Sequence, residues 1–415
     1  MNTLVSPLRP VSVPSRPTAL PPAAKTVIGM LDQLQGGSLQ LRLPGRGPLT
    51  LGQGALRAEF DVHDAGVFAR VLGEGDIGFG EAYIDGQWSS PDPTALLALL
   101  ADNRQVLRRA VHGRWLSVLG HRLRHLMRAN TRTGSRRNIL AHYDLGNEFY
   151  RLWLDPSMTY SAALFGRGGS GTLTLEQAQQ AKYLRLLDRL DPRPDDVILE
   201  VGCGWGGFAE AAVRHYGCRV HGITLSPAQL AFARARAERG GWADRAEFSL
   251  TDYRDVHRGG TGYDHIVSIE MFEAVGERYW PSYFRQLRRV LKPGGRAAIQ
   301  TITIDDAHFA AYRRGTDFIQ RHIFPGGMLP SPSVFARRAA AVDFRVADRH
   351  AFGIDYAETL ALWHQRFELA WPDIARQGFD ERFRRLWRFY LAYCEAGFRS
   401  GATDVYHFLL EGPAG

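Results

Sequence analysis

Hydrophobic and polar positions along the second half of the chain form a regular series of strand-like and helix-like runs. The apolar run "DDVILEVG" precedes the helical pattern "GGFAEAAVRHYG", and "CRVHGITLS" precedes "PAQLAFARARAERG". Three more strand patterns follow in "RAEFSL", "YDHIVSI" and "RAAIQTITI". Apolar strands that alternate with helices are typical of a parallel sheet covered by helices on both faces. We therefore predict an α/β fold with a doubly wound parallel sheet, which binds ligands outside the carboxyl ends of its strands.

A smaller α+β domain is predicted over residues 30–105. Short alternating runs punctuated by glycine and proline indicate strands over residues 38–62. The apolar spacing in "AGVFARVL" and "PTALLALLADNR" predicts two helices after these strands. The preceding residues 1–29 are rich in proline, serine and arginine and contain no compact apolar stretch. We expect these residues to form a disordered tail.

Residues 106–138 are expected to connect the two domains as a basic amphipathic helix followed by a hinge. The stretch "QVLRRAVHGRWLSVLGHRLRHLMR" has apolar residues at helical spacing and six arginines among them. Such a helix can lie on an anionic membrane surface. It can equally pack its apolar side against protein, so both interpretations remain open.

The composition narrows the choice of partners and compartment. The 415-residue chain has 51 Lys and Arg against 43 Asp and Glu, a formal charge of +8. This excess favours anionic surfaces such as nucleic acid or the phosphate face of a membrane. The three cysteines form no pair with metal-ligand or redox spacing, so we expect no metal site and a reducing cytosol. No apolar run reaches the roughly 18 residues of a spanning helix, so we expect a cytoplasmic protein that contacts membranes from the surface.

The stretch "EVGCGWGGF", between the first strand and first helix of the predicted sheet, has the composition of a ligand-binding turn. Glycines such as Gly202 and Gly204 let the backbone turn tightly and approach a ligand closely. Dinucleotide enzymes usually place an acidic residue after the second strand to bind ribose, whereas this chain has Thr224 and Gln229 there. The glycine pattern after Glu200 resembles the first motif of the class I S-adenosylmethionine methyltransferases, so we expect that cofactor.

A longer series of segments resembles one family within that class. The segments are "HYDLGNEFYRLWLDPSMTYSAALF", "VGCGWGGF", "GITLSPAQ", "DYRD", "MFEAVG", "HIFPGGMLPS", "DYAETLALWHQRF" and "FYLAYCEAGFRSG". In this order they resemble the cyclopropane-fatty-acyl-phospholipid synthase family, which includes the mycolic acid methyltransferases. The resemblance runs from about residue 139 to 410. It implies a Rossmann-like methyltransferase domain with lipid-binding insertions over residues 139–415, preceded by the family's smaller domain.

The resemblance also implies an activity and a set of partners. The expected reaction is methyl transfer from S-adenosylmethionine to the cis double bond of an unsaturated fatty acyl chain of a phospholipid. The implied partners are membrane phospholipid acyl chains and an anionic membrane surface at the inner face of the membrane. The residues that the resemblance assigns to cofactor binding are Tyr160, Ser161, Gly202, Gly204, Thr224, Leu225, Gln229, Asp252 and Tyr253.

In this family a bicarbonate ion is held as the base that removes a proton from the methylated chain. The positions that correspond to its binding site here are Glu273, Tyr356, the backbone of Ile302, Ala162 in place of a cysteine, and Gln300 in place of a histidine. Ala162 retains a backbone N–H, but Gln300 can neither carry charge nor shuttle a proton. Bicarbonate binding and direct use of Glu273 as the base both remain open. So do a cyclopropane and a methyl-branched product.

Two other classes of function remain open at this stage. The first is a methyltransferase that acts on RNA or on a soluble small molecule. We recognise no RNA-binding module in the sequence and expect no nucleic-acid partner. The second is a lipid- or cofactor-binding protein without catalytic activity, because Ala162 and Gln300 replace reactive side chains. The oligomeric state also stays open, with a homodimer as one alternative.

Overall fold

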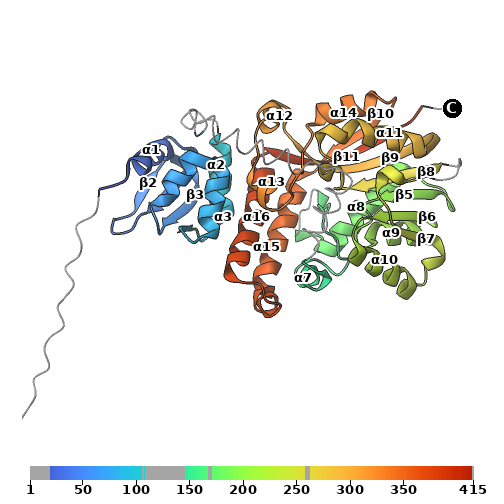
Figure 1. Cartoon of the computed structure of the whole chain (residues 1–415), viewed down its shortest axis with the longest axis horizontal. Helices are drawn as coiled ribbons and strands as arrows, with labels where there is room; N and C mark the ends of the chain where they lie inside the picture. Colours follow the sequence, from blue (N-terminus) through green and yellow to red (C-terminus); the bar gives the residue numbers. More distant parts are fainter. Residues whose placement is uncertain (1–18, 105–106, 108–144, 167–170, 258–261, 414–415) are drawn as a thin grey trace, which may run out of the picture.

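The computed structural model describes residues 19–104, 107, 145–166, 171–257 and 262–413. Figure 1 shows a small N-terminal sheet with its helices at one end of the molecule and a larger sheet at the other. The long helices α15 (Gly353–Arg376) and α16 (Glu381–Arg399) lie between them. The expected basic linker helix and hinge over residues 106–138 lie outside the described residues, apart from Leu107.

The N-terminal domain combines a four-stranded sheet with three helices. Its elements are α1 (Pro22–Leu31), β1 (Gln35–Arg42), β2 (Leu49–Leu51), β3 (Gln53–Val62), α2 (Gly66–Ile84), β4 (Trp88–Ser89) and α3 (Pro93–Asp102). The strand order is β2-β1-β3-β4, in which β1 and β3 are parallel and the other pairs are antiparallel. This arrangement agrees with the α+β pattern expected from the sequence.

The expectation of a disordered tail over residues 1–29 is wrong for residues 22–29, which belong to helix α1, while residues 1–18 lie outside the described part of the chain. Helix α1 begins at Pro22, and its side chains Ala24, Val27 and Met30 are buried. Proline is well tolerated in the first turn of a helix because its missing N–H would be unpaired there anyway. The proline-rich composition therefore concealed a helix whose apolar face belongs to the core.

The larger domain has a seven-stranded sheet in the order β10-β11-β9-β8-β5-β6-β7. Its strands are β5 (Val197–Val201), β6 (Arg219–Thr224), β7 (Ala246–Leu250), β8 (Tyr263–Ile269), β9 (Leu291–Ile304), β10 (Arg345–Ala351) and β11 (Thr403–Glu411). The five predicted strands are parallel as expected. Strand β11 adds antiparallel to β9, and β10 adds antiparallel to β11. The doubly wound α/β fold is therefore confirmed, with an antiparallel extension that the sequence did not predict.

Each face of this sheet has its own hydrophobic core. The helices of the larger domain are α7 (Asn147–Arg151), α8 (Leu175–Leu190), α9 (Gly207–Tyr216), α10 (Pro227–Gly240), α11 (Trp280–Val290), α12 (Asp306–Tyr312), α13 (Phe318–His322), α14 (Pro332–Ala340), α15 and α16. Side chains of α8, α9 and α10 cluster with Ile198 and Val220. Side chains of α11 and α14 cluster with the neighbouring Leu199. Adjacent residues of one strand thus point to opposite faces, and the strand ends are left free to form a site.

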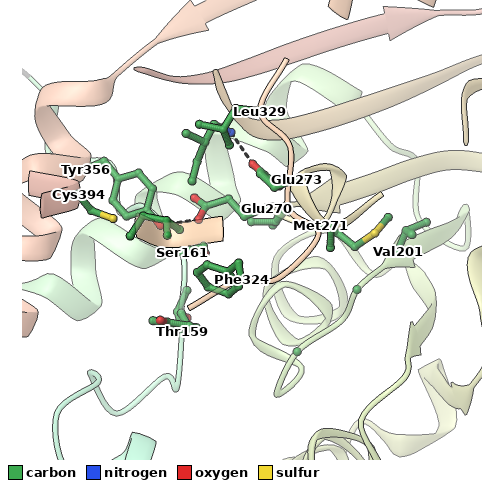
Figure 2. Close-up of a pocket in the computed structure, with 18 of the residues that line it drawn as sticks. Thr159, Ser161, Val201, Glu270, Met271, Glu273, Phe324, Leu329, Tyr356 and Cys394 are labelled. Carbon is green, nitrogen blue, oxygen red and sulfur yellow. Dashed lines mark hydrogen bonds between the residues drawn. The ribbon is translucent and has the colours of Figure 1, made fainter. Parts of the chain in front are cut away.

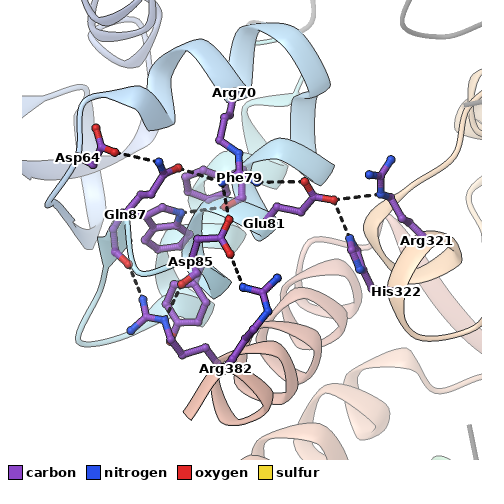
Figure 3. Close-up of polar contacts among 12 residues, drawn as sticks. Asp64, Arg70, Phe79, Glu81, Asp85, Gln87, Arg321, His322 and Arg382 are labelled. Carbon is purple, nitrogen blue, oxygen red and sulfur yellow. Dashed lines mark hydrogen bonds and ion pairs between the residues drawn. The ribbon is translucent and has the colours of Figure 1, made fainter. Parts of the chain in front are cut away.

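Helix α16 joins the two domains. Arg385 donates hydrogen bonds to the backbone carbonyls of Tyr83 (2.5 Å) and Trp88 (2.8 Å), and its guanidinium lies over the Tyr83 ring. The buried Phe389 contacts Trp88 edge to face. Figure 3 shows polar contacts at the same boundary, including the ion pair of Arg382 with Asp85. The N-terminal domain is therefore built onto the helices that line the cavity described below.

A second group of ion pairs connects the N-terminal domain to α13. The carboxylate of Glu81 on α2 lies 3.0 Å from Arg321 and 3.1 Å from His322 (Figure 3).

Among the described residues, no helix is both long and apolar enough to cross a membrane.

Candidate active site

A cavity of about 330 Å³ lies at the carboxyl ends of β5, β6 and β8. Its walls come from the glycine-rich turn after β5, from the segment around Tyr160, and from helices α15 and α16. This is the edge at which doubly wound sheets bind ligands, and the volume falls in the usual range for small-molecule pockets. Figure 2 shows some of the residues that line it.

The turn after β5 requires glycine at the positions expected to contact the cofactor. Gly202 and Gly204 have φ angles of +86° and +51°, in the left-handed region that side chains other than glycine rarely adopt. A Cβ atom at Gly202 would lie 3.1 Å from the Cγ of Met271, whereas one at Gly204 would meet no protein atom within 4 Å. The turn therefore leaves a space beside its backbone that a ligand can occupy.

Eight of the nine residues assigned to cofactor binding line this cavity: Tyr160, Ser161, Gly202, Gly204, Thr224, Leu225, Gln229 and Tyr253. Thr224 donates from its hydroxyl to the side-chain oxygen of Gln229 (2.9 Å), which fixes both side chains at the end of β6. The ninth residue, Asp252, caps the short 3-10 helix η3 (Tyr253–Asp255). Its carboxylate accepts hydrogen bonds from the Arg254 side chain at 2.6 and 2.8 Å. The structure thus brings eight of the nine into the cavity wall and engages Asp252 with Arg254.

The buried ionisable side chains in and beside the cavity are mostly acidic. Glu200, Glu270 and Glu273 all line it, and the fully buried Lys182 lies next to it, donating to the Ser161 hydroxyl at 2.6 Å. Burial raises the pKa of Glu200 well above its usual value and lowers the pKa of Lys182 to about 7. A bound cation would favour the ionised carboxylates, because opposite charge lowers a carboxyl pKa. The cavity is therefore better suited to a positively charged ligand than to an anionic one.

The residues fit S-adenosylmethionine, which carries a sulfonium cation and an amino group. Glu200 is the last residue but one of β5, next to the glycine turn, and among the described residues its Oε2 atom has no hydrogen-bond partner. A buried carboxylate oxygen of this kind is costly unless a ligand donates to it. Glu200 was noted in the sequence only as part of the glycine pattern. Its place at the end of a buried parallel strand was the signal that it faces the ligand.

The five positions expected to hold a bicarbonate ion lie together but divide into two groups. Glu273, which follows β8, accepts hydrogen bonds on Oε1 from the Thr301 hydroxyl (2.9 Å) and from the backbone N–H of Ile302 (2.5 Å). Among the described residues its Oε2 has no partner. Burial, followed by repulsion from Glu270, raises the pKa of Glu273 to about 8. At neutral pH Glu273 is therefore mainly protonated.

The other three positions surround a residue that the sequence did not single out, Glu270. Its Oε1 accepts from the backbone N–H of Ala162 (2.8 Å) and from the side-chain amide of Gln300 (2.7 Å). Its Oε2 accepts from the hydroxyl of Tyr356 (2.7 Å), a contact visible in Figure 2. We call these three donors, on Ala162, Gln300 and Tyr356, the donor set. The signal that could have identified Glu270 in the sequence is an acidic residue directly after an apolar parallel strand, because functional groups gather at the carboxyl ends of such strands.

A further buried residue fixes the orientation of Gln300. The amide nitrogen of Gln300 faces two acceptors, Glu270 and the carbonyl of Ala162 (3.4 Å). Its amide oxygen lies 2.8 Å from Nε2 of His407 on β11. Because that oxygen can only accept, His407 donates through Nε2, and burial lowers the pKa of His407 so that the ring is neutral. The neutral histidine thus points the Gln300 amide hydrogens at Glu270.

Comparisons with known proteins show the family to which this chain is similar. Residues 130–408 match the family described as mycolic acid cyclopropane synthetase. Tuberculostearic acid methyltransferase UfaA1 of Mycobacterium tuberculosis is 41% identical over 362 residues, covering 85% of this chain and 83% of that protein. The cyclopropane-fatty-acyl-phospholipid synthase of Escherichia coli is 34% identical over 360 residues, covering 85% and 87%. The crystal structure of mycolic acid cyclopropane synthase CmaA1 complexed with SAH and CTAB has a TM-score of 0.61 and 32% identity, over 66% of this chain and 98% of that one.

Proposed function

Because the chain belongs to the mycolic acid cyclopropane synthetase family, we propose that it transfers a methyl group from S-adenosylmethionine to an unsaturated fatty acyl chain. The acceptor in this proposal is the cis double bond of a phospholipid acyl chain. The names of two relatives support it, since one is a cyclopropane-fatty-acyl-phospholipid synthase and the other a tuberculostearic acid methyltransferase.

The observation that carries the proposal is the continuity of one cavity from the glycine turn to an apolar wall. At one end it is lined by Gly202 and Gly204, and at the other by Leu360, Tyr390 and Phe398 from α15 and α16. The buried carboxylates lie along the same cavity. A polar cofactor site that opens directly onto an apolar space suits a reaction between a charged methyl donor and a hydrocarbon chain.

The residues of the cavity can assist this chemistry in three ways. S-adenosylmethionine, when bound, supplies an electrophilic methyl group. The apolar walls exclude water, which would otherwise capture a carbocation on the chain. Aromatic faces such as that of Tyr390 attract positive charge, and a nearby carboxylate can accept the proton that must leave.

Two products are compatible with this cavity. Loss of a proton from the transferred methyl group closes a cyclopropane ring, whereas loss from a neighbouring chain carbon leaves a methyl-branched alkene. Both products are heavier than the substrate by one CH2 unit, so they differ in whether a double bond remains.

Association with an anionic membrane surface belongs to the same proposal. It is supported by the net charge of +8 and by the arginine-rich sequence of residues 106–138, because basic segments are attracted to anionic lipid. Phospholipid as the acceptor requires such contact. The proposed place of action is the cytoplasmic face of the membrane, and the N-terminal domain, the linker and the methyltransferase domain are proposed to work as one unit there.

The proposal is tested with the purified full-length chain, methyl-labelled S-adenosylmethionine and vesicles. We expect label in the lipid when the vesicles contain a cis-unsaturated acyl chain, and none when the same headgroup carries saturated chains. Catalytic hydrogenation of the labelled product then separates an alkene from a ring. Transfer of label to RNA with none in unsaturated lipid would contradict the proposal, as would the absence of labelled lipid when the cofactor binds.

A further inference from the structure

We propose that Glu270 is the base that accepts the proton lost by the methylated acyl chain, and that its carboxylate takes the place of a free bicarbonate ion. The inference rests on the function proposed above, because the proton arises in that reaction. Beyond that function, the inference assigns a catalytic residue of the chain itself, so that the reaction needs no external base.

The hydrogen-bond geometry is the first argument. Each member of the donor set directs an N–H or O–H at Glu270, at 2.7–2.8 Å. The sequence resemblance assigns the same three positions, Ala162, Gln300 and Tyr356, to the binding of a separate oxyanion. The Glu270 carboxylate uses the donors that such an ion would need, so this side chain and a bicarbonate ion compete for one place.

The position of Glu270 in the cavity is the second argument. The residue directly follows β8, whose end lies beside the end of β5 and therefore beside the glycine turn. Glu270 lines the same cavity as Gly202 and Phe398. A carboxylate there faces both the donor of the methyl group and the apolar space proposed for the acyl chain.

The backbone of Glu270 is the third argument. Its φ angle is +49°, in the left-handed region that is unfavourable for residues with a Cβ atom. In folded proteins strain of this kind concentrates at functional sites. Glycine would remove the strain, so a glutamate here is explained by what its side chain does.

The contrast with Glu273 is the fourth argument. Glu273 has two donors on a single oxygen, and its raised pKa keeps it mainly protonated at neutral pH. Burial also raises the pKa of Glu270, but its hydrogen bonds from Tyr356 and Ala162 act in the opposite direction. Burial raises the pKa of Tyr356 well above its usual value, so its hydroxyl keeps its proton and donates it. Of the two carboxyl groups, Glu270 is therefore the one with hydrogen-bond donors on both oxygens, and such donors favour the ionised form that a base requires.

The proposed step balances without any further reactant. The π electrons of the double bond form the new C–C bond to the methyl carbon, and the electron pair of the broken C–S bond stays on sulfur. One chain carbon is left positively charged. A C–H bond then gives its electron pair to that carbon, closing a ring or forming a new double bond, and its proton to Glu270. The protonated carboxyl group releases this proton to solvent after the product leaves.

The experiment compares the wild-type chain with Glu270→Gln in buffers freed of bicarbonate and in buffers with bicarbonate added. The glutamine keeps the shape of the side chain but cannot accept the proton. We expect the wild-type rate to be the same in both buffers and the rate of the variant to fall by about 10²–10⁴-fold, the usual range for loss of a general base. Binding of S-adenosylmethionine, measured by calorimetry, should persist in the variant.

A second variant, Glu270→Gly, tests the exchange between side chain and ion. Glycine accepts the left-handed backbone without strain and leaves room beside the donor set. We expect this variant to be inactive without bicarbonate and to regain part of its activity when bicarbonate or formate is added. A chain that gains both a methyl and a hydroxyl group in either variant would support the proposal further, because it shows a carbocation that water captures when no base is present.

The outcomes separate this inference from the function it rests on. If the wild-type chain methylates unsaturated lipid but stops when bicarbonate is removed, the inference is wrong and the proposed function stands. The same holds if Glu270→Gln retains nearly the full rate. If the wild-type chain binds the cofactor and yields no lipid product in either buffer, the proposed function fails and this inference fails with it.

Discussion

The two halves of the cavity are built in different ways. The cofactor half is centred on one continuous stretch, in which β5 runs into the glycine turn and then into α9, and residues from the segment around Tyr160 and from the ends of β6 and β7 complete it. The carboxylate half is assembled from separate places in the chain: Ala162, the end of β8, the middle of β9 and the start of α15. A continuous stretch fixes its geometry through local backbone preferences, whereas an assembled site depends on the whole fold being in place.

This difference suggests that the two halves can be damaged separately. Changes in the glycine turn should weaken cofactor binding, and changes around Glu270 should slow the reaction while the cofactor still binds. The three predictions below test this separation, in order of decreasing effect.

The largest effect is expected from Gly204→Ala. The added methyl group meets no protein atom within 4 Å, so it intrudes mainly on the space for a ligand. We expect the Kd for S-adenosylmethionine, measured by calorimetry, to rise by up to about 100-fold, as for other overpacked sites. Gly241→Ala is the matched control, because Gly241 has a φ angle of +70° and open space around it but lies at the end of α10. Equal affinities in the two variants would show that the turn does not hold the cofactor.

An intermediate effect is expected from Tyr356→Phe. The variant removes one member of the donor set, and a hydrogen bond to a charged group contributes about 1.5–3 kcal/mol. We expect kcat for lipid methylation to fall about tenfold or more while the Kd for the cofactor stays unchanged. Tyr216→Phe is the control, since the Tyr216 hydroxyl donates to Asp188, a carboxylate outside the cavity. A loss of cofactor affinity in Tyr356→Phe would mean that the two halves are not separate.

The smallest effect is expected in the pH dependence of stability. The carboxyl group of Glu273 loses its proton near pH 4.5 in the unfolded chain and near pH 8 in the folded protein. Between these values the folded protein holds more protons, so this group lowers the free energy of unfolding as pH rises. We expect the Tm of the wild type, relative to Glu273→Gln, to fall between pH 5 and pH 8 by about 2–4 °C for each kcal/mol lost.

The control for that measurement is Glu238→Gln, which changes an exposed carboxylate on α10. Its Tm should follow that of the wild type across the same pH range. A wild-type Tm that rises relative to Glu273→Gln between pH 5 and pH 8 would show that Glu273 is ionised in the folded protein.

The cofactor half was also the easier half to predict from the sequence. The strand pattern and the glycines of 202–207 are local features, and the structure places them as expected. The positions of Ala162 and Gln300 were found through the family resemblance, but their common partner was not. Glu270 does not belong to any of the resembling segments, and three of its hydrogen-bond partners lie 30 to 108 residues away in the chain.

Two of the elements that the sequence analysis missed, β10 and α1, were missed for physical reasons. No residue of strand β10 is buried. Its sequence "RVADRHA" therefore lacks the alternation of apolar and polar residues that reveals a strand. It forms because it pairs with β11 at the edge of the sheet. Helix α1 was hidden by the proline-rich residues that precede it. In each case tertiary contacts, rather than local preference, decide the structure.

The close fit of the N-terminal domain against α16 has a consequence for any attempt to shorten this protein. Gly80 on α2 comes so near to Phe318 and Phe389 that an added Cβ would lie 2.5 and 2.7 Å from their ring atoms. Removal of the first hundred residues would expose the Phe318 and Phe389 rings to solvent. It would leave an apolar surface on α16, the helix that also carries Tyr390 and Phe398. The truncated protein would aggregate through this exposed apolar surface and would not serve as a minimal catalyst.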